Sequence, residues 1–260
     1  MIITDAVELS SPYVLGMRVD PTCYEKASRT ILEWARAKSS RYVCVANVYN
    51  AMTAHDSSEF LRVTNGADLV TPDGMPLVWC LKAFGHSQAS RVYGPDLTRA
   101  LIAKAAASGI SVGFYGGTPE TVQLLQPAIE SQYPGLRVAY VSSPPFRPLT
   151  PEEDEEAVQE INHSGVGILF VGLGTPKQDY WMAAHKGRIQ SVMVGVGAAF
   201  DFLAGTKPQA PRWMMRIGME WFFRLATEPR RLWKRYLKHN PRFIVLFAAQ
   251  LLRERRLRFQ

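Results

Sequence analysis

The chain has 260 residues, 47% of them hydrophobic and 20% charged, which is an ordinary composition for a globular protein. Its three cysteines, Cys23, Cys44 and Cys80, lack CxxC spacing, which argues against a disulfide scaffold or a zinc site and fits a reducing compartment. No basic segment followed by an apolar run opens the chain, and the longest apolar stretch, residues 243–252, is about half as long as a membrane-spanning helix. We therefore expect no signal peptide and no transmembrane helix.

Charge is distributed unevenly along the chain. Residues 211–260 contain thirteen Lys or Arg and three Glu, a net charge of +10, whereas the whole chain has +7, so residues 1–210 have −3. A basic segment of this kind indicates an anionic partner, such as phospholipid, nucleic acid or a phosphorylated substrate.

Short apolar segments rich in β-branched residues alternate with helical segments over residues 1–210. They predict strands at residues 42–48, 68–71, 111–115, 136–141, 167–171 and 191–196. Helix start signals, in which a threonine precedes a proline, occur at Thr118, Thr150 and Thr175. The alternation predicts an α/β fold with a Rossmann-like, mostly parallel sheet and helices on both faces. Ligands bind such sheets outside the carboxyl ends of the strands.

The last fifth of the chain has no strand pattern and interleaves aromatic with basic residues. We expect Pro229 and Pro241 to divide it into three helices. The chain is thus predicted to contain a Rossmann-like catalytic domain at residues 1–210 and a basic, aromatic helical appendage at residues 211–260. Such helices suit the headgroup region of an anionic membrane. They also suit a helical subdomain with an aromatic core and solvated arginines.

Glycines gather at the ends of three predicted strands. Glycine there lets backbone N–H groups approach a ligand, and the following helix N-terminus attracts phosphate. Tight turns need glycine in any α/β protein, but three together favour a nucleotide-type ligand. The spacing matches neither GxGxxG nor GxxxxGK[ST], which counts against an NAD enzyme or an ATPase. The glycines are Gly116, Gly117, Gly172, Gly174, Gly195 and Gly197.

Asp73 is the carboxylate of greatest interest. It ends the apolar segment at residues 68–71 and precedes Gly74 and a helix. There it can point into the ligand crevice and accept a proton from an attacking hydroxyl, or it can cap the helix that begins near Met75. Asn47, at the end of the preceding strand, can bind a ligand at the same edge or serve as a turn residue.

Three further residues near the glycine turns have both a ligand-binding and a structural interpretation. Gln178 contacts a ligand or closes a capping box. Lys177 meets a phosphate or is solvated. Asp201 binds a sugar hydroxyl or caps a helix.

No residue pattern indicates a metal site. No Asp-x-Asp pair lies in a strand-end loop, and the five histidines are scattered, so we expect neither a metal ion nor another cofactor. A departing diphosphate would then need basic side chains to neutralise it. The appendage supplies Arg224, Arg230, Arg231, Lys234 and Arg235.

Collinear blocks along most of the chain carry a specific resemblance. They are residues 67–74 (ADLVTPDG), 91–97 (RVYGPDL), 114–117 (FYGG), 171–178 (VGLGTPKQ), 195–201 (GVGAAFD), and 220–225 (EWFFRL) with 228–232 (EPRRL). With these blocks the chain resembles the WecG/TagA/CpsF glycosyltransferases, which act on lipid-linked sugars in the assembly of bacterial surface polysaccharides.

The resemblance implies an inverting, metal-independent hexosyl transfer from a UDP-sugar to a polyprenyl-diphosphate-linked acceptor. It implies that Asp73 is the base, with Asn47 and Gln178 in the sugar pocket. It also implies that the appendage docks at the cytoplasmic face of the plasma membrane and supplies arginines to the diphosphate. The residues that we expect to bind the donor are Gly74, Arg91, Gly116, Gly117, Gly174, Lys177 and Asp201.

Two positions depart from the family pattern and bear on donor choice. The family often has Thr two residues before the asparagine that matches Asn47, where this chain has Val45, and its common Gln-Glu pair is Gln178-Asp179 here. The alternatives are another nucleotide-binding Rossmann-like protein, either an oxidoreductase, whose cofactor fingerprint is missing, or a nucleic-acid binder, which leaves the glycine turns unexplained. We expect no nucleic-acid partner and leave a homo-oligomer open.

Overall fold

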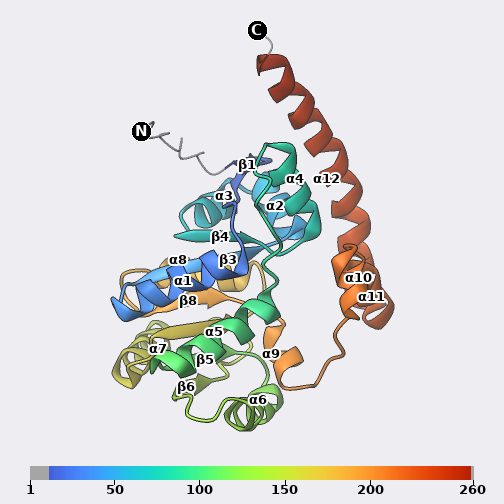
Figure 1. Ribbon diagram of the computed structural model, residues 1–260. Helices are drawn as coiled ribbons and strands as arrows, with labels where there is room; N and C mark the ends of the chain where they lie inside the picture. Colours follow the sequence, from blue (N-terminus) through green and yellow to red (C-terminus); the bar gives the residue numbers. More distant parts are fainter. Residues whose placement is uncertain (1–11, 259–260) are drawn as a thin grey trace, which may run out of the picture.

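A six-stranded sheet forms the centre of the computed structural model, which describes residues 12–258 (Figure 1). The strands lie in the order β4-β3-β8-β7-β5-β6, and every neighbouring pair is parallel. The first residues of the chain, for which we expect no signal peptide, lie outside the described range. The strand bounds are β3 Arg41–Ala46, β4 Leu69–Pro72, β5 Val112–Gly116, β6 Val138–Ser142, β7 Ile168–Gly172 and β8 Val192–Gly195.

These strands confirm the six predicted segments and the α/β fold. Successive side chains of a strand point to opposite faces of the sheet. In β3, Tyr42 and Cys44 belong to the apolar core on one face, whereas Val43 and Val45 belong to the core on the other. Because both faces are buried, the strands read as nearly continuous apolar runs.

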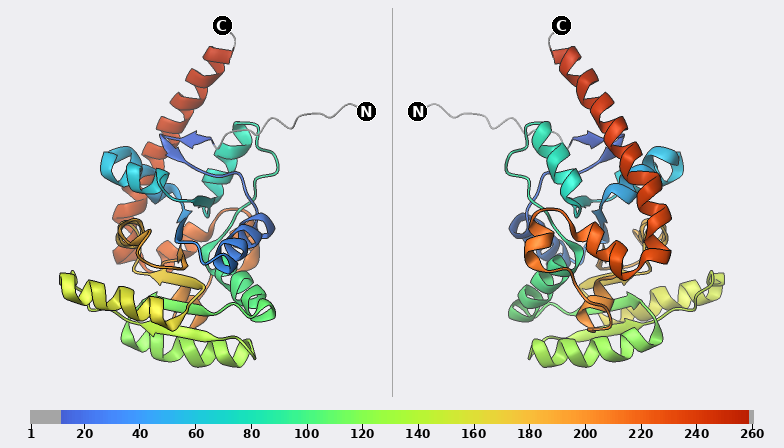
Figure 2. Two further views of the ribbon diagram at one scale, coloured as in Figure 1. Left: turned by 90° about the vertical axis from the view of Figure 1, so that its left-hand side faces the viewer. Right: turned by 90° about the vertical axis from the view of Figure 1, so that its right-hand side faces the viewer.

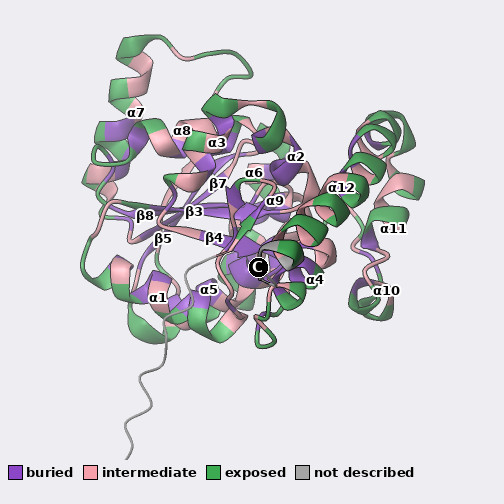
Figure 3. Ribbon diagram, turned by 90° about the horizontal axis from the view of Figure 1, so that it is seen from above, coloured by how far each residue is buried: buried purple, intermediate pink, exposed green. Residues whose placement is uncertain are grey.

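Helices contribute to both cores, and their outer surfaces are exposed (Figure 3). The core on the Cys44 face includes residues of α2 Val48–Asp56, α3 Ser58–Asn65, α4 Met75–Ala83, α7 Pro151–Ser164 and α8 Lys177–His185. The core on the Val43 face includes residues of α1 Tyr24–Arg36, α5 Gly94–Ser108, α6 Pro119–Gln132 and α9 Ala199–Leu203.

Two of the three predicted helix start signals are confirmed. Thr118 caps α6 by accepting a hydrogen bond from the Thr121 N–H, and Thr150 forms a capping box with Glu153 at the start of α7. At Thr175 a helix, α8, does begin directly after Pro176, but the predicted capping box is wrong, because the start of α8 has no side-chain cap. Gln178, the expected partner of that capping box, has its side-chain oxygen bonded elsewhere.

The appendage forms α10 Arg212–Arg216, α11 Glu220–Thr227 and α12 Pro229–Arg258. The long α12 packs along α2 and then extends beyond the rest of the described chain (Figure 2). A short antiparallel hairpin, β1 Tyr13–Val14 and β2 Met17–Arg18, which the sequence pattern did not predict, also holds it. The Gln250 amide of α12 accepts a hydrogen bond from the Leu15 N–H at 2.9 Å and donates one to the Tyr13 carbonyl at 2.7 Å.

The predicted break at Pro241 is wrong, because α12 continues through it. A proline leaves the carbonyl four residues earlier, that of Leu237, without its helical hydrogen bond, and Leu237 lies on the exposed side of the helix, where it is 68% exposed. Contacts on both sides of the proline hold the helix against the domain. His239 packs edge-on against Tyr49, and Arg242 forms a two-pronged ion pair with Asp56 at 2.8 and 2.9 Å.

In the part of the chain that the structure describes, no helix combines the length and the apolar character needed to cross a membrane.

Candidate active site

The ends of two neighbouring strands bring Asp73 and Asn47 together. The Asp73 N–H donates to the carbonyl of Ala46, the last residue of β3, at 2.7 Å. Gly74 lies against Asn47, since a Cβ at Gly74 would be 3.4 Å from the Asn47 Cβ. Both side chains therefore start from the carboxyl edge of the sheet, where ligands bind this type of fold.

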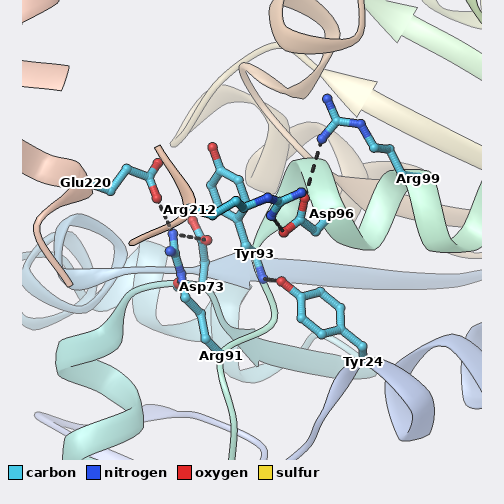
Figure 4. Close-up of polar contacts among 8 residues, drawn as sticks. All are labelled: Tyr24, Asp73, Arg91, Tyr93, Asp96, Arg99, Arg212 and Glu220. Carbon is cyan, nitrogen blue, oxygen red and sulfur yellow. Dashed lines mark hydrogen bonds and ion pairs between the residues drawn. The ribbon is translucent and has the colours of Figure 1, made fainter. Parts of the chain in front are cut away.

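Asp73 does not cap α4: the capping position is Gly74, and the cap has no side-chain hydrogen bond. Arg91 faces Asp73 instead (Figure 4). The Arg91 Nε donates to the Asp73 backbone carbonyl, and its Nη2 lies 3.5 Å from the Asp73 Oδ1. This Oδ1 atom is buried and has no hydrogen-bond partner among the described residues.

Burial raises the pKa of Asp73 to about 6. The positive charge of Arg91 acts against this rise, the negative charge of Glu220 adds to it, and the positive charge of Arg224 and the Gly94 N–H oppose it. A carboxylate with a pKa slightly below neutral is ionised at pH 7 and still holds a proton well enough to serve as a general base.

Asn47 is the N-cap of α2. Its Oδ1 accepts a hydrogen bond from the Tyr49 N–H at 2.9 Å, and its own N–H donates to the Asn50 Oδ1 at 3.1 Å. Asn47 is therefore a helix cap rather than the turn residue of the structural interpretation, and it lies beside Gly74 at the edge of the sheet.

Gln178 ties together the loops that follow β7 and β8. Its Oε1 accepts hydrogen bonds from the Gly174 N–H and the Gly197 N–H, each at 3.1 Å, and the residue is only 3% exposed. Gly174 has φ +78° with no atom near its missing Cβ, so the positive φ itself favours glycine there. Gln178 thus fixes the shape of the edge next to Asn47 and Asp73.

Gly116 is required by close backbone packing. A Cβ on Gly116 would lie 2.6 Å from the backbone carbon of Gly172, and the Gly117 N–H donates to the Gly172 carbonyl at 3.2 Å. The turns after β5 and β7 therefore meet directly. Lys177, which follows the β7 turn, lies 4.6 Å above the ring of the exposed Phe146.

Asp201 does not cap α9, whose capping residue is Ala198. Its Oδ2 forms an ion pair with the Lys207 Nζ at 2.7 Å, and its Oδ1 accepts a hydrogen bond from the Thr121 hydroxyl at 3.3 Å. Lys207 also lies 3.9 Å from Glu228 of the appendage. Asp201 therefore stands where the domain meets α11 and α12.

A cavity of about 340 Å³ lies at this junction, and Arg224 is the appendage arginine that lines it. The Arg224 Nε is buried without a hydrogen-bond partner among the described residues, and its charge also acts on Asp73. Arg224 thus links the cavity to Asp73. The lining residues are Phe202, Lys207, Pro208, Arg224, Thr227 and Glu228.

The other basic residues predicted to meet a diphosphate have different surroundings. Arg231 is exposed and forms an ion pair with Glu228, and Arg230 is exposed. Lys234 is 5.6 Å from the Trp233 ring. Arg235 packs 3.7 Å above the ring of Tyr49, where burial lowers its pKa to about 10.

Both departures from the family pattern are buried. Val45 belongs to the core and faces Gly94. Asp179 is fully buried beside Cys44 and Thr175, and burial raises its pKa to about 6. Neither oxygen of Asp179 has a well-formed hydrogen bond among the described residues.

Two residues at the site were missed by the sequence interpretation. Glu220 forms an ion pair with Arg91 through the same Nη2 that faces Asp73 (Figure 4), and Lys207 lines the cavity. The sequence did contain a signal for Glu220, because a rare acidic residue in a strongly basic segment indicates a possible ion pair with a buried basic residue. Lys207 had none, because it is an isolated lysine in a loop.

Among the described residues, no group of three or more His, Cys, Asp or Glu side chains is arranged to hold a metal ion.

The comparisons with known proteins agree with this architecture. Residues 12–257 match the glycosyl transferase WecG/TagA/CpsF family. One curated relative, from Bacillus spizizenii, is 29% identical over 197 residues, which cover 75% of this chain and 74% of the relative. It is named N-acetylglucosaminyldiphosphoundecaprenol N-acetyl-beta-D-mannosaminyltransferase. The family match decides against the oxidoreductase and nucleic-acid-binding alternatives. The chain belongs to the WecG/TagA/CpsF family and is a glycosyltransferase.

Proposed function

We propose that this glycosyltransferase moves a sugar from a UDP-sugar to a polyprenyl-diphosphate-linked acceptor, with inversion and without a metal ion. The observation that carries the proposal is Asp73. It combines a place at the carboxyl edge of a parallel sheet, a pKa raised to about 6, an ion pair with Arg91 and the nearby positive charge of Arg224.

In the proposed reaction the acceptor hydroxyl oxygen bonds to the anomeric carbon of the donor sugar, on the face opposite the departing UDP. The bond from that carbon to the UDP oxygen breaks, and its electron pair leaves with the diphosphate. The Asp73 carboxylate takes the hydroxyl proton as the new bond forms. A single displacement of this kind inverts the anomeric centre.

The diphosphate carries negative charge that must be neutralised as the bond breaks. Arg224 has a buried Nε without a hydrogen-bond partner among the described residues, and it lines the cavity with Lys207. Arg231, beside Glu228, is the next cation along the appendage. Guanidinium groups suit phosphate oxygens because they donate two parallel hydrogen bonds.

The class of substrates follows from the Bacillus relative, whose name states transfer of N-acetyl-β-D-mannosamine to N-acetylglucosaminyldiphosphoundecaprenol. Such an acceptor is anchored in a bilayer, so the enzyme must bind at the cytoplasmic face of the membrane. Large exposed apolar side chains lie on the appendage among its basic residues, which suits the headgroup region. They are Trp213, Ile217, Trp221, Phe222, Trp233, Leu237, Ile244, Val245 and Leu252.

The test is a transfer assay with a short-chain N-acetylglucosaminyl-diphosphate lipid and a panel of UDP-sugars, beginning with UDP-N-acetylmannosamine. We expect turnover that survives a chelator and a product of inverted configuration. Asp73→Asn should lower kcat by about 10²- to 10⁴-fold, the usual contribution of a general base, while UDP binding by calorimetry stays measurable. Full activity of the folded Asp73→Asn variant would refute Asp73 as the base, and dependence on added metal would refute the metal-independent mechanism.

A further inference from the structure

Glu220 is a buried acid in an otherwise basic appendage. It is the first residue of α11 and only 8% exposed. Its Oε2 contacts the Arg91 Nη2, and this pair joins the appendage to the loop between α4 and α5. Removing a charged group from water is unfavourable unless it is paired, so the docked position of α11 depends on this contact.

Arg91 is held in place by four groups at once. Its Nε donates to the Asp73 carbonyl, its guanidinium carbon lies 4.4 Å from the centre of the Tyr93 ring, and its Nη2 faces two carboxylates. The closer carboxylate belongs to Glu220, and the Asp73 Oδ1 is 3.5 Å away. The Arg91 guanidinium is thus shared between two carboxylates, and that of Glu220, on the appendage, makes the closer contact.

We propose that Glu220 is a positioning residue that holds the Arg91 guanidinium on the appendage side. The Asp73 carboxylate then keeps one long ion pair instead of a close salt bridge. This inference rests on the proposed function, in which Asp73 is the base. It adds that the appendage contributes a negative charge to the site as well as its arginines.

The charged and titratable groups around Asp73 come from three elements. Arg91 and Tyr93 come from the loop before α5, Glu220 and Arg224 from α11, and Tyr24 from α1. Burial raises the pKa of Tyr24 to about 12 and that of Tyr93 well above its usual range, so both phenols are neutral at pH 7. The pKa of Asp73 is therefore set by burial, the two arginines, Glu220 and the Gly94 N–H.

The charges around Asp73 determine whether its pKa rises or falls when Glu220 is removed. The charge of Glu220 raises the pKa of Asp73, and the charge of Arg91 lowers it. Without Glu220, the Asp73 carboxylate loses a repelling charge and gains the whole Arg91 guanidinium. Its pKa falls, and it becomes a weaker base. An undocked α11 would have the same consequence, so the base is fully active only when the appendage is in place.

The experiment compares Glu220→Gln with the wild-type chain. The amide keeps the shape of the side chain and removes its charge. We expect the acidic limb of the pH profile of kcat/KM to move to lower pH by roughly one unit. Above the limb, kcat/KM should fall by about threefold, because a base that is weaker by one pKa unit loses part of its driving force.

Asp56→Asn is the matched control, because it also removes a carboxylate that pairs the domain with the appendage, through Arg242. If Glu220→Gln acted only by loosening the docked appendage, Asp56→Asn would move the limb of the pH profile in the same direction. We expect the limb to move only in the Glu220 variant. If Glu220→Gln does not fold, Glu220→Asp serves instead: it withdraws the carboxylate by one methylene and should give a smaller shift in the same direction.

A second measurement does not depend on turnover. Carbon-13 NMR of carboxyl-labelled aspartates, with the Asp73 signal assigned by its loss in Asp73→Asn, reports the titration of Asp73 directly. We expect this titration to move to lower pH in Glu220→Gln. An unmoved titration and an unmoved limb would overturn the inference and leave Asp73 as the base. Full activity of Asp73→Asn would overturn the proposed function itself.

Discussion

Two clusters of acidic and basic side chains lie where the appendage meets the domain. The pKa of Asp73 in the first cluster and the pKa of Glu228 in the second are shifted in opposite directions. At the edge of β4, Asp73 shares one arginine with Glu220, and burial raises its pKa to about 6. At the cavity, burial acts to raise the pKa of Glu228, but hydrogen bonding and charge from Arg231, together with Lys207, hold it below its usual range.

The difference lies in the ratio of cations to acids. The first cluster leaves a carboxylate poorly neutralised, which suits proton transfer. In the second cluster, Asp201 and Glu228 have Lys207 and Arg231 as partners, and Arg224 lines the same cavity. That cluster has cations to spare, which suits an anionic ligand. We infer that proton transfer takes place at the first cluster and diphosphate binding at the second.

The largest expected effect is a change in the free energy of unfolding. This change should have opposite signs when the carboxylate of the first cluster and that of the second are replaced. The pKa of Asp73 is about 6 in the folded protein and about 3.9 in an unfolded chain, so ionisation is less favourable in the fold. This group therefore reduces the free energy of unfolding as pH rises from about 4 to about 6, and the full reduction applies above pH 6. Asp73→Asn should stabilise the protein by about 2–3 kcal/mol at pH 8 and by little at pH 4.

Glu228→Gln should behave in the opposite way. A lowered pKa means that the Glu228 carboxylate stabilises the fold above the unfolded pKa, and that this contribution is lost as pH falls through the folded pKa. The glutamine variant should thus be less stable than the wild type at pH 8 and close to it in acid. Urea unfolding of both variants between pH 4 and pH 8 is the measurement. A destabilised Asp73→Asn at pH 8 would contradict the raised pKa.

The next largest effect is the loss of kcat/KM when one of two appendage arginines, Arg224 or Arg231, is replaced. Arg224 has a buried Nε without a hydrogen-bond partner among the described residues, whereas Arg231 is exposed and already paired with Glu228. Arg224→Ala should lower kcat/KM by about 10- to 100-fold, the equivalent of one or two charge-assisted hydrogen bonds. Arg231→Ala should lower it by less than about tenfold. Steady-state kinetics with saturating acceptor compare the two losses. Equal losses of kcat/KM would show that burial of Arg224 gives it no greater role than the exposed Arg231.

The smallest expected effect concerns the membrane. Trp213 on α10 is 61% exposed next to basic residues of the appendage. Trp213→Ser should weaken flotation with anionic liposomes several-fold, and added salt should weaken binding of both wild type and variant because the headgroup attraction is screened. Phe146→Ser is the control, since Phe146 is 98% exposed on the loop after β6. Equal losses in the two variants would remove the special role of the appendage.

Much of the domain was predictable from sequence because its determinants are local. All six strands of the main sheet read as apolar, β-branched runs, since both faces of a parallel sheet are buried. Thr118 and Thr150 cap helices as predicted, since a cap depends on residues within one turn. The placement of Asp73 at a strand end followed from the same short-range reasoning.

What could not be predicted depends on contacts between distant segments. Pro241 failed to end α12 because Arg242 and Gln250 fasten the helix to Asp56 and to the β1–β2 hairpin. The expected capping role of Gln178 gave way to hydrogen bonds with the loops after β7 and β8.

The sequence by itself determined the sheet, the helix starts set by local caps and the identity of the charged groups. Only the tertiary structure decided which of these groups share a partner. Arg91 and Glu220 are 129 positions apart in the chain, and no local pattern records that their contact also sets the charge around Asp73. The physical reason is that a pKa depends on burial and on charges within a few ångströms, and both are properties of the assembled fold.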